Sequence, residues 1–171
     1  RALKLSWGPA VDKDSGIWQY AVYRDDVQIA VVGPGTGDIV EVTDDTVEDG
    51  KTYVYQVRAV NLGKVESAPA ELRFVFLDAV PPRLLTVTCY ASTPDRVRLM
   101  FSKPMDASQA ATPGNYTLSP DIRVKSADVS EDGTTVVLHL PSALQKNASC
   151  RLSLGPLVDQ AAAHNRVANR E

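Results

Sequence analysis

Two aspartates in an early polar loop have the types and spacing that could hold a metal ion. Asp12 and Asp14 alternate with Lys13 and Ser15, and Gly16 follows. Alternate carboxylates ahead of a glycine can wrap a hard cation, and Ca²⁺ takes about six to eight oxygen ligands. The glutamate that would close a full calcium loop is absent. We therefore interpret the segment as a solvated loop without a cofactor, and keep Asp12 and Asp14 as candidate calcium ligands.

Two histidines are the other side chains that could take part in catalysis or bind zinc. His139 lies in an alternating run opposite Leu138, and His164 lies near the end of the chain. Neither has an acidic or cysteine neighbour at zinc-ligand spacing. Serine, histidine and aspartate all occur, but no nucleophile-elbow motif positions them. The sequence therefore predicts that this chain is not an enzyme.

Trp18 is the aromatic residue with the clearest binding potential. It stands where a loop meets a strand, and an exposed indole offers a flat apolar face to a sugar ring or a neighbouring domain. Tyr23 is its candidate companion, because it faces away from the core position Val22. The alternative is that Trp18 folds over the end of its own core. Polysaccharide is therefore one candidate partner, and neighbouring domains of a parent protein are the other.

The charge pattern excludes some partners. Net charge is −3, with −5 in residues 1–80 and +2 in residues 81–171, which argues against nucleic acid. We interpret the acidic group at positions 44, 45, 48 and 49 as a solvated rim. No stretch approaches the ~20 apolar residues of a membrane span. The chain starts without methionine and enters a strand almost at once, so we expect a piece of a longer protein.

Residues 76–82 organise the whole chain. Pro81 and Pro82 donate no ladder hydrogen bonds and disfavour helix in the residue before them. Short alternating runs separated by Gly, Pro and Asp turns lie on both sides, as is typical of β-sandwiches. We predict an all-β fold of two tandem immunoglobulin-like β-sandwiches, at residues 1–78 and 83–171. The short Pro-containing linker is residues 79–82, and residues 123–129 are expected to form one strand.

Both cysteines lie in the second half, at Cys89 and Cys150. Each is in register with apolar neighbours at alternate positions, so we interpret both as small buried structural residues. A disulfide between them would suit a secreted domain. The sequence leaves this choice open, since it does not show how closely the two Cα atoms approach.

Three segments of the first half match a known pattern: Trp7 at the end of an early strand, residues 16–25, and residues 47–61. Through them, residues 3–76 resemble the fibronectin type III domains. The resemblance implies structural roles for Trp7, Tyr20 and Tyr53, with Tyr53 as the corner residue whose hydroxyl holds the loop backbone where two sheets meet. Asp49 replaces the usual loop proline.

The same resemblance implies that the first strand of the family is missing, because residues 3–7 align with the second. A missing strand leaves a sheet edge open, or means that the strand lies upstream in a longer protein. An open edge would also allow the chain to associate with itself.

Four segments of the second half, at residues 97–106, 113–118, 130–138 and 157–159, carry a second resemblance. Through them, residues 83–165 resemble the bacterial Ig-like domains of S-layer and secreted multidomain proteins. The two resemblances together imply a non-catalytic spacer or interaction module from a secreted or cell-surface bacterial protein, accessory to a carbohydrate-active enzyme or surface protein. The alternatives are a carbohydrate-binding module that uses Trp18 and a self-associating surface-layer module.

Overall fold

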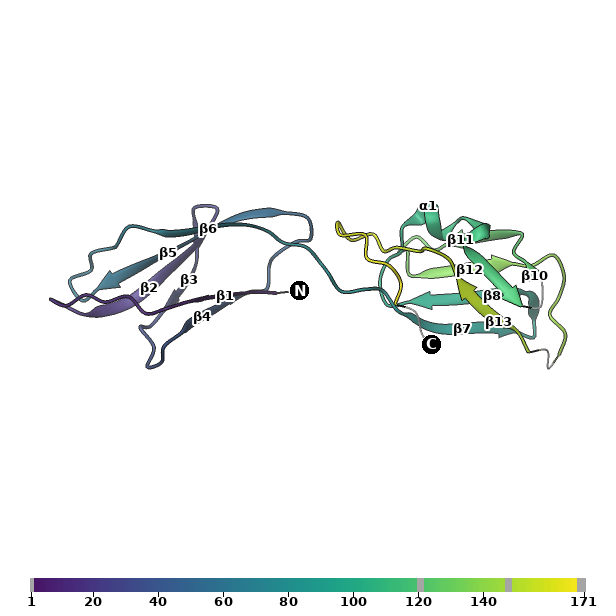
Figure 1. Cartoon of the computed structure of the whole chain (residues 1–171), viewed down its shortest axis with the longest axis horizontal. Coiled ribbons are helices and arrows are strands. Elements are labelled where there is room, and N and C mark those ends of the chain that lie inside the picture. Colours follow the sequence, from purple (N-terminus) through teal and green to yellow (C-terminus); the bar gives the residue numbers. More distant parts are fainter. Residues whose placement is uncertain (1, 120–121, 147–148, 169–171) are drawn as a thin grey trace. The chain divides into compact units, whose positions relative to one another are not determined.

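The computed structural model describes residues 2–119, 122–146 and 149–168 (Figure 1). The chain divides into two compact units, Arg1–Asp78 and Ala79–Glu171, and strands dominate both. Each unit places two antiparallel sheets around its own core. The fold class is therefore all-β with immunoglobulin-like sandwiches, as the alternating sequence predicts. None of the helices in the described part of the chain has the length and apolar character that a membrane crossing requires.

Unit 1 contains six strands in two sheets. The strands are β1 (Leu3–Trp7), β2 (Ile17–Arg24), β3 (Val27–Val32), β4 (Val40–Asp44), β5 (Thr52–Asn61) and β6 (Ala70–Val75). One sheet has the order β3-β2-β5-β6, and the other contains only β1 and β4. All pairs are antiparallel. A two-residue turn joins β2 to β3, and both of its residues, Asp25 and Asp26, have positive φ, which matches the right-handed twist of the strands.

The core of unit 1 is small and rich in tyrosine. Its buried members are Leu5, Val22, Val47, Tyr53 and Tyr55. Beside them, the ring of Tyr20 packs edge-on against Trp7, with centroids 5.5 Å apart. The Tyr20 hydroxyl accepts a hydrogen bond of 2.7 Å from the backbone N–H of Ala10. The aromatic residues therefore fill the core and also hold the loops at its ends.

The described residues of unit 2 form seven strands and two short helical turns, the second being η1 (Pro113–Asn115). The strands are β7 (Leu84–Tyr90), β8 (Thr93–Phe101), β9 (Tyr116–Ser119), β10 (Ile122–Arg123), β11 (Ser126–Val129), β12 (Thr135–His139) and β13 (Arg151–Leu154). Helix α1 (Ala107–Ala110) begins at Asp106, whose carboxylate accepts a hydrogen bond from the Gln109 N–H. The sheets have the orders β11-β12-β8-β7 and β10-β9-β13.

The single strand expected at residues 123–129 is wrong. The chain forms β10 on one sheet and β11 on the other, because it crosses between the two sheets after Arg123. A sheet change interrupts the ladder without interrupting the extended backbone, so the sequence shows one continuous β-type run. On β8, the alternate residues Val97, Leu99 and Phe101 all have buried side chains.

Hydrogen bonds assign the segment around residues 78–83 to one unit or the other. The Asp49 carboxylate accepts the backbone N–H of Asp78 at 2.6 Å within unit 1. Asp49, which stands where the resembled family has proline, therefore anchors the end of this unit. In unit 2, Lys103 donates to the carbonyl of Val80, and the Arg83 N–H donates to Ser102 Oγ at 2.9 Å. Unit 2 thus holds the chain from Val80 onward.

Candidate functional sites

The Asp12 carboxylate stabilises its own loop by accepting hydrogen bonds. Oδ1 accepts the N–H groups of Asp14 and Ser15, both at 3.0 Å. Oδ2 accepts from the Ser15 hydroxyl at 3.2 Å and from the Asn61 side-chain amide at 3.0 Å. These hydrogen bonds, led by the one from the Ser15 backbone, lower the pKa of Asp12 to about 2. The low pKa therefore has a cause within the protein, in four donors of the loop and of β5.

The metal prediction for Asp12 and Asp14 has little support from this geometry. Asp14 is exposed, and both oxygens of Asp12 already accept hydrogen bonds from the protein. Across the described ranges, no three His, Cys, Asp or Glu side chains lie close enough together to hold a metal ion. A Ca²⁺ ion at this loop would have to displace the bonds from Ser15 and Asn61.

Trp18 and Tyr23 lie on the same strand but form no joint platform. Trp18 is 44% exposed and stands at a β-bulge, between Ile17 and Gln19 in the pairing of β2 with β5. Tyr23 is five positions further on, about 16 Å along an extended strand, so the two rings cannot hold one sugar ring together.

A cationic side chain lies over each of these two aromatic rings. Lys64 Nζ lies 5.9 Å from the centre of the Trp18 ring, and the guanidinium of Arg58 lies 5.8 Å from that of Tyr23. The Lys64 ammonium therefore lies over the face of the indole that a sugar ring would stack on.

The expectation of a solvated acidic rim is wrong for Asp44. This residue is 5% exposed and connects the two sheets of unit 1. Its Oδ2 accepts from Arg24 Nη1 at 2.7 Å and from the Tyr55 hydroxyl at 2.8 Å, both on the four-stranded sheet. Its Oδ1 accepts from the hydroxyl and the N–H of Thr46. Asp45 and Glu48 are exposed, as expected.

The electrostatics of this cluster are those of a structural ion pair. Burial alone would raise the pKa of Asp44, but the hydrogen bonds from Thr46 and Tyr55 and the charge of Arg24 outweigh it, so the pKa is lowered. Burial and the bond to Asp44 raise the pKa of the Tyr55 phenol, which stays protonated. Tyr53 lies under the Arg24 guanidinium, 5.0 Å from its carbon. Sequence reasoning missed the cluster because its partners come from three separate strands.

Tyr53 makes the contact expected of a corner tyrosine. Its hydroxyl accepts the backbone N–H of Glu48, five residues upstream, at 2.8 Å. The bond ties the loop before β5 to the strand that follows it, where the two sheets meet.

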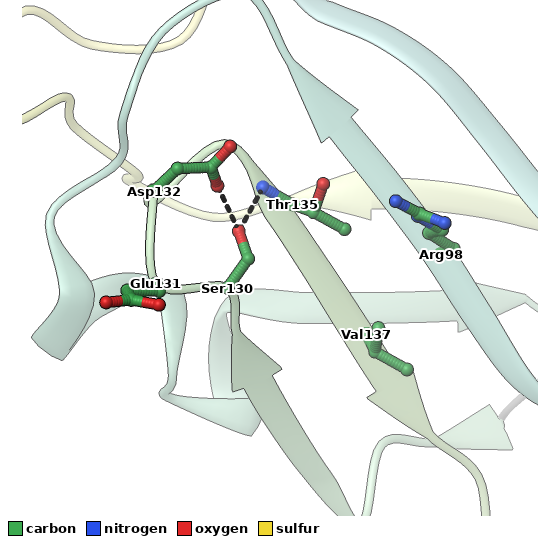
Figure 2. Close-up of a pocket in the computed structure, with 6 residues that line it drawn as sticks. All are labelled: Arg98, Ser130, Glu131, Asp132, Thr135 and Val137. Atoms are coloured by element: carbon green, nitrogen blue, oxygen red, sulfur yellow. Dashed lines mark hydrogen bonds between the residues drawn. The ribbon is translucent and has the colours of Figure 1, made fainter.

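A surface depression with a volume of about 570 Å³ lies on unit 2. The turn between β11 and β12 forms one wall, with Ser130, Glu131 and Asp132, and Figure 2 shows Arg98 beyond Val137 on the sheet. The Ser130 hydroxyl donates to Asp132 Oδ1 at 2.5 Å and accepts the Thr135 N–H at 2.9 Å. The hydrogen bonds among the side chains of this depression stabilise its own turn.

His139 has an acidic partner that the sequence analysis missed. Its Nε2 lies 2.7 Å from Oδ2 of Asp128, across the antiparallel pair of β11 and β12. The two residues are eleven positions apart, and only the hairpin register brings them together. His164 lies in the segment after β13, at a left-handed backbone position with a φ of 46°. The structure does not bring the two histidines into a common site among the described residues.

The expectation of a buried Cys89 is wrong. Cys89 is exposed, Cys150 is half-buried, and both are free thiols. The reason is that β7 is an edge strand whose pairing with β8 shifts register between Thr88 and Tyr90. Cys89 lies opposite the extra residues of β8 between Thr93 and Arg98, so the alternation that predicted burial does not apply to it.

Unit 2 has its own buried carboxylate, Asp159, which is 1% exposed. Its oxygens accept hydrogen bonds from the N–H of Ala161 and from the N–H and side-chain amide of Asn165, at 2.9–3.2 Å. Lys103 Nζ lies 3.5 Å away. The carboxylate therefore organises the segment after β13, and sequence reasoning gave it no role.

Comparison with known proteins finds only distant structural similarity. No protein-family model and no curated protein matches it. A solved structure of the N-terminal part of the bacterial S-layer protein SbsC is 23% identical over 54% of this chain and 22% of that one, with a TM-score of 0.48. The central fibronectin-III array of RIM-binding protein is 13% identical over 90% of this chain and 63% of that one, with a TM-score of 0.39. The chain thus spans less than two thirds of either protein, and the strand pairings described above define its architecture.

Proposed function

We propose that this chain is a non-catalytic spacer and interaction module of a larger secreted or cell-surface bacterial protein, accessory to a carbohydrate-active enzyme or a surface protein. The observation that carries the proposal is the use of the acidic side chains. Asp12, Asp44, Asp106 and Asp132 all have lowered pKa values, and each accepts hydrogen bonds from its own loop or from the facing sheet. Perturbed carboxylates at a catalytic site would converge on one cleft, whereas these four lie in separate segments of the chain.

The architecture supports the same proposal. Each unit has its own core and its own buried aspartate cluster, so each has the internal bonding of an independent module. The bacterial and extracellular setting is inferred from the resemblance of residues 83–165 to Ig-like domains of S-layer and secreted proteins. One of the two solved structures found by comparison is also part of a bacterial S-layer protein.

The experiment is a pull-down of the purified chain on a panel of insoluble polysaccharides, combined with sedimentation velocity. A spacer stays in the supernatant across the panel and sediments as a monomer at every concentration. Hydrolysis of any polysaccharide by the purified chain would contradict the proposal directly.

Carbohydrate binding through Trp18 is the second candidate, and the 44% exposure of this indole favours it. The matched control is Tyr90, a 52% exposed aromatic residue of unit 2. Retention on one polysaccharide that Trp18→Ala removes and Tyr90→Ala leaves unchanged would make the chain a binding module. Retention that survives both substitutions would place the binding surface elsewhere.

A further inference from the structure

The depression of about 570 Å³ on unit 2 lies on the outer face of the four-stranded sheet. Arg98 of β8 is paired with Val137 of β12, and both line the depression together with Thr135. Their neighbours Leu99 and Val136 are buried, so these three side chains lie on the face away from the core. Figure 2 shows them on one side of the sheet, beside the turn. Because β8 and β12 are the two inner strands, the floor of the depression has no free edge.

Arg98 contributes a cation to this depression. Its side chain is exposed and forms no hydrogen bond or ion pair with another residue in the described part of the chain. Asp128, the acid of β11 that is paired with Val137, lies 2.7 Å from the His139 ring instead. Arg96 is also exposed and lies on the same face, about 7 Å along the strand from Arg98. Two guanidinium groups therefore have their hydrogen-bond donors available to a ligand.

The other residues of the depression supply hydroxyl, carboxylate and apolar groups. Thr135 is half-buried, and its backbone N–H donates to Ser130 Oγ, which leaves its hydroxyl available. Glu131 and Asp132 line the side formed by the turn. Hydrogen bonds, first the one from the Ser130 hydroxyl, lower the pKa of Asp132, so this carboxylate stays charged and can accept further hydrogen bonds. Val137 provides an apolar floor between the charged groups.

The distribution of charge favours one class of ligand. Residues 81–171 carry a net charge of +2, and a guanidinium binds a carboxylate through two parallel hydrogen bonds. An acidic peptide would bring several carboxylates toward Glu131 and Asp132, which repel them. A sugar ring carries hydroxyl groups, which donate to carboxylates and accept from threonine and arginine. A ring with one carboxylate and several hydroxyls, as in a uronic acid, therefore matches both sides of the depression.

We propose that this depression binds the uronic acid residues of an acidic polysaccharide. The inference gives a ligand class to the interaction role proposed above and rests on it. Arg98 binds the carboxylate of one sugar, Thr135 and Asp132 bind its ring hydroxyls, and Val137 lies against its C–H groups. Arg96, about 7 Å further along β8, binds the carboxylate of a neighbouring sugar in the polymer.

The test is a titration of the whole chain with the tetramer of galacturonic acid, followed by NMR. We expect the Arg98 Nε–H signal and the backbone N–H signals of Thr135 and Val137 to shift together and to saturate. The methyl-esterified tetramer keeps the hydroxyls without the charges, and a tetraglutamate peptide keeps the charges without the sugar rings. Both should bind at least about tenfold more weakly. Equal binding of either control, or no saturable shift with the tetramer, would overturn the proposal.

Substitutions at exposed arginines test the site itself. Arg98→Gln removes the cation and should weaken binding of the tetramer by at least about tenfold. Arg123→Gln is the matched control, because it makes the same change at an exposed position of β10, on the other sheet of unit 2, and should change the affinity less than about twofold. Arg98→Lys keeps the charge but loses the paired hydrogen bonds, and should weaken binding about three- to tenfold. Equal losses for the two glutamine variants would mean that net charge alone attracts the tetramer, and would overturn the site.

Other results would place the ligand or the occupant elsewhere. Shifts at the Trp18 indole without shifts at Arg98 would place the tetramer on unit 1. An Arg98 Nε–H that exchanges slowly with solvent before any ligand is added would place an acidic group of the protein itself in the depression. Either result would overturn the proposal. Hydrolysis of the tetramer would contradict the proposed function, whereas absence of binding would overturn only the site, so the two can fail separately.

Discussion

The two sandwiches differ in the size of their buried cores. Unit 2 surrounds a continuous core of twelve buried residues, whereas the buried core cluster of unit 1 has five, three of them aliphatic. In unit 1, Leu72 and Phe74 remain exposed on the inner face of their sheet. On the edge strand of unit 2, Val87 is likewise 50% exposed although it pairs with the buried Leu99, so the two units differ in the size of the core rather than in the exposure of their edge strands.

The buried aspartates sharpen this contrast. Asp44 joins the two sheets of unit 1 through Arg24 and Tyr55. Asp159 holds the segment after β13 through Asn165, with Lys103 nearby. Unit 1, with its smaller core, thus depends on a polar link between sheets, whereas the sheets of unit 2 are held mainly by apolar packing.

The largest expected effect is that of Asp44→Ala. The substitution leaves the Tyr55 hydroxyl buried without its partner and removes the carboxylate that pairs with the half-buried Arg24, so unit 1 should lose about 3 kcal/mol of unfolding free energy. Urea unfolding followed by tryptophan fluorescence measures it, since both tryptophans, Trp7 and Trp18, lie in unit 1. The control Asp45→Ala removes an exposed carboxylate and should change stability by less than about 0.5 kcal/mol. Similar losses of unfolding free energy in both variants would contradict the role of Asp44 as a link between the two sheets.

Leucine truncations compare the two cores directly. Leu99→Ala removes a side chain that is 0% exposed and should cost unit 2 about 2–5 kcal/mol. Leu72→Ala, at a 54% exposed position of β6, should cost unit 1 about 1 kcal/mol or less. Amide hydrogen exchange resolved by unit measures both losses. If Leu72→Ala were as destabilising as Leu99→Ala, the Leu72 side chain would have to be buried in solution.

Tyr53→Phe should have a moderate effect. The change removes the acceptor of the Glu48 N–H but keeps the ring beneath Arg24, so unit 1 should lose about 0.5–1.5 kcal/mol. Tyr23→Phe is the control, because it makes the same change at a half-buried position of β2. The same urea unfolding experiment measures both, and equal losses would contradict the corner role of Tyr53.

The smallest effect is the acid response of the Asp12 loop. Its folded-state pKa of about 2 lies below the ordinary 3.8, so the carboxylate stabilises the folded loop above about pH 3.8, and this contribution disappears as the pH falls through 2. NMR signals of the Ser15 N–H and the Asn61 side-chain amide should therefore shift near pH 2. In Asp12→Asn both shifts should be absent. Their persistence in that variant would assign the transition to another group.

Much of the architecture was predictable because alternation reports which residues face a core. The runs ending at Phe101 on β8 and at His139 on β12 show it without structural information. The burial of Asp44 was not predictable, since its partners Arg24 and Tyr55 lie twenty residues upstream and eleven downstream and meet it only across two sheets.

Irregular strands account for the other differences. Cys89 was expected inside because alternation assumes an unbroken ladder, and the bulge between Thr88 and Tyr90 breaks it. Leu72 and Phe74 on β6 follow the same logic. Alternation shows that they face inward, but not how far they are buried.

The exposed position of Cys89 on β7 has a practical consequence. Cys89 is the more accessible of two free thiols, and both thiols belong to unit 2, whereas both tryptophans belong to unit 1. A maleimide dye on Cys89 in a Cys150→Ser chain would report on unit 2 without a label on unit 1. The natural sequence thus supplies an orthogonal pair of spectroscopic probes, one for each module, with which their unfolding can be followed separately in one sample.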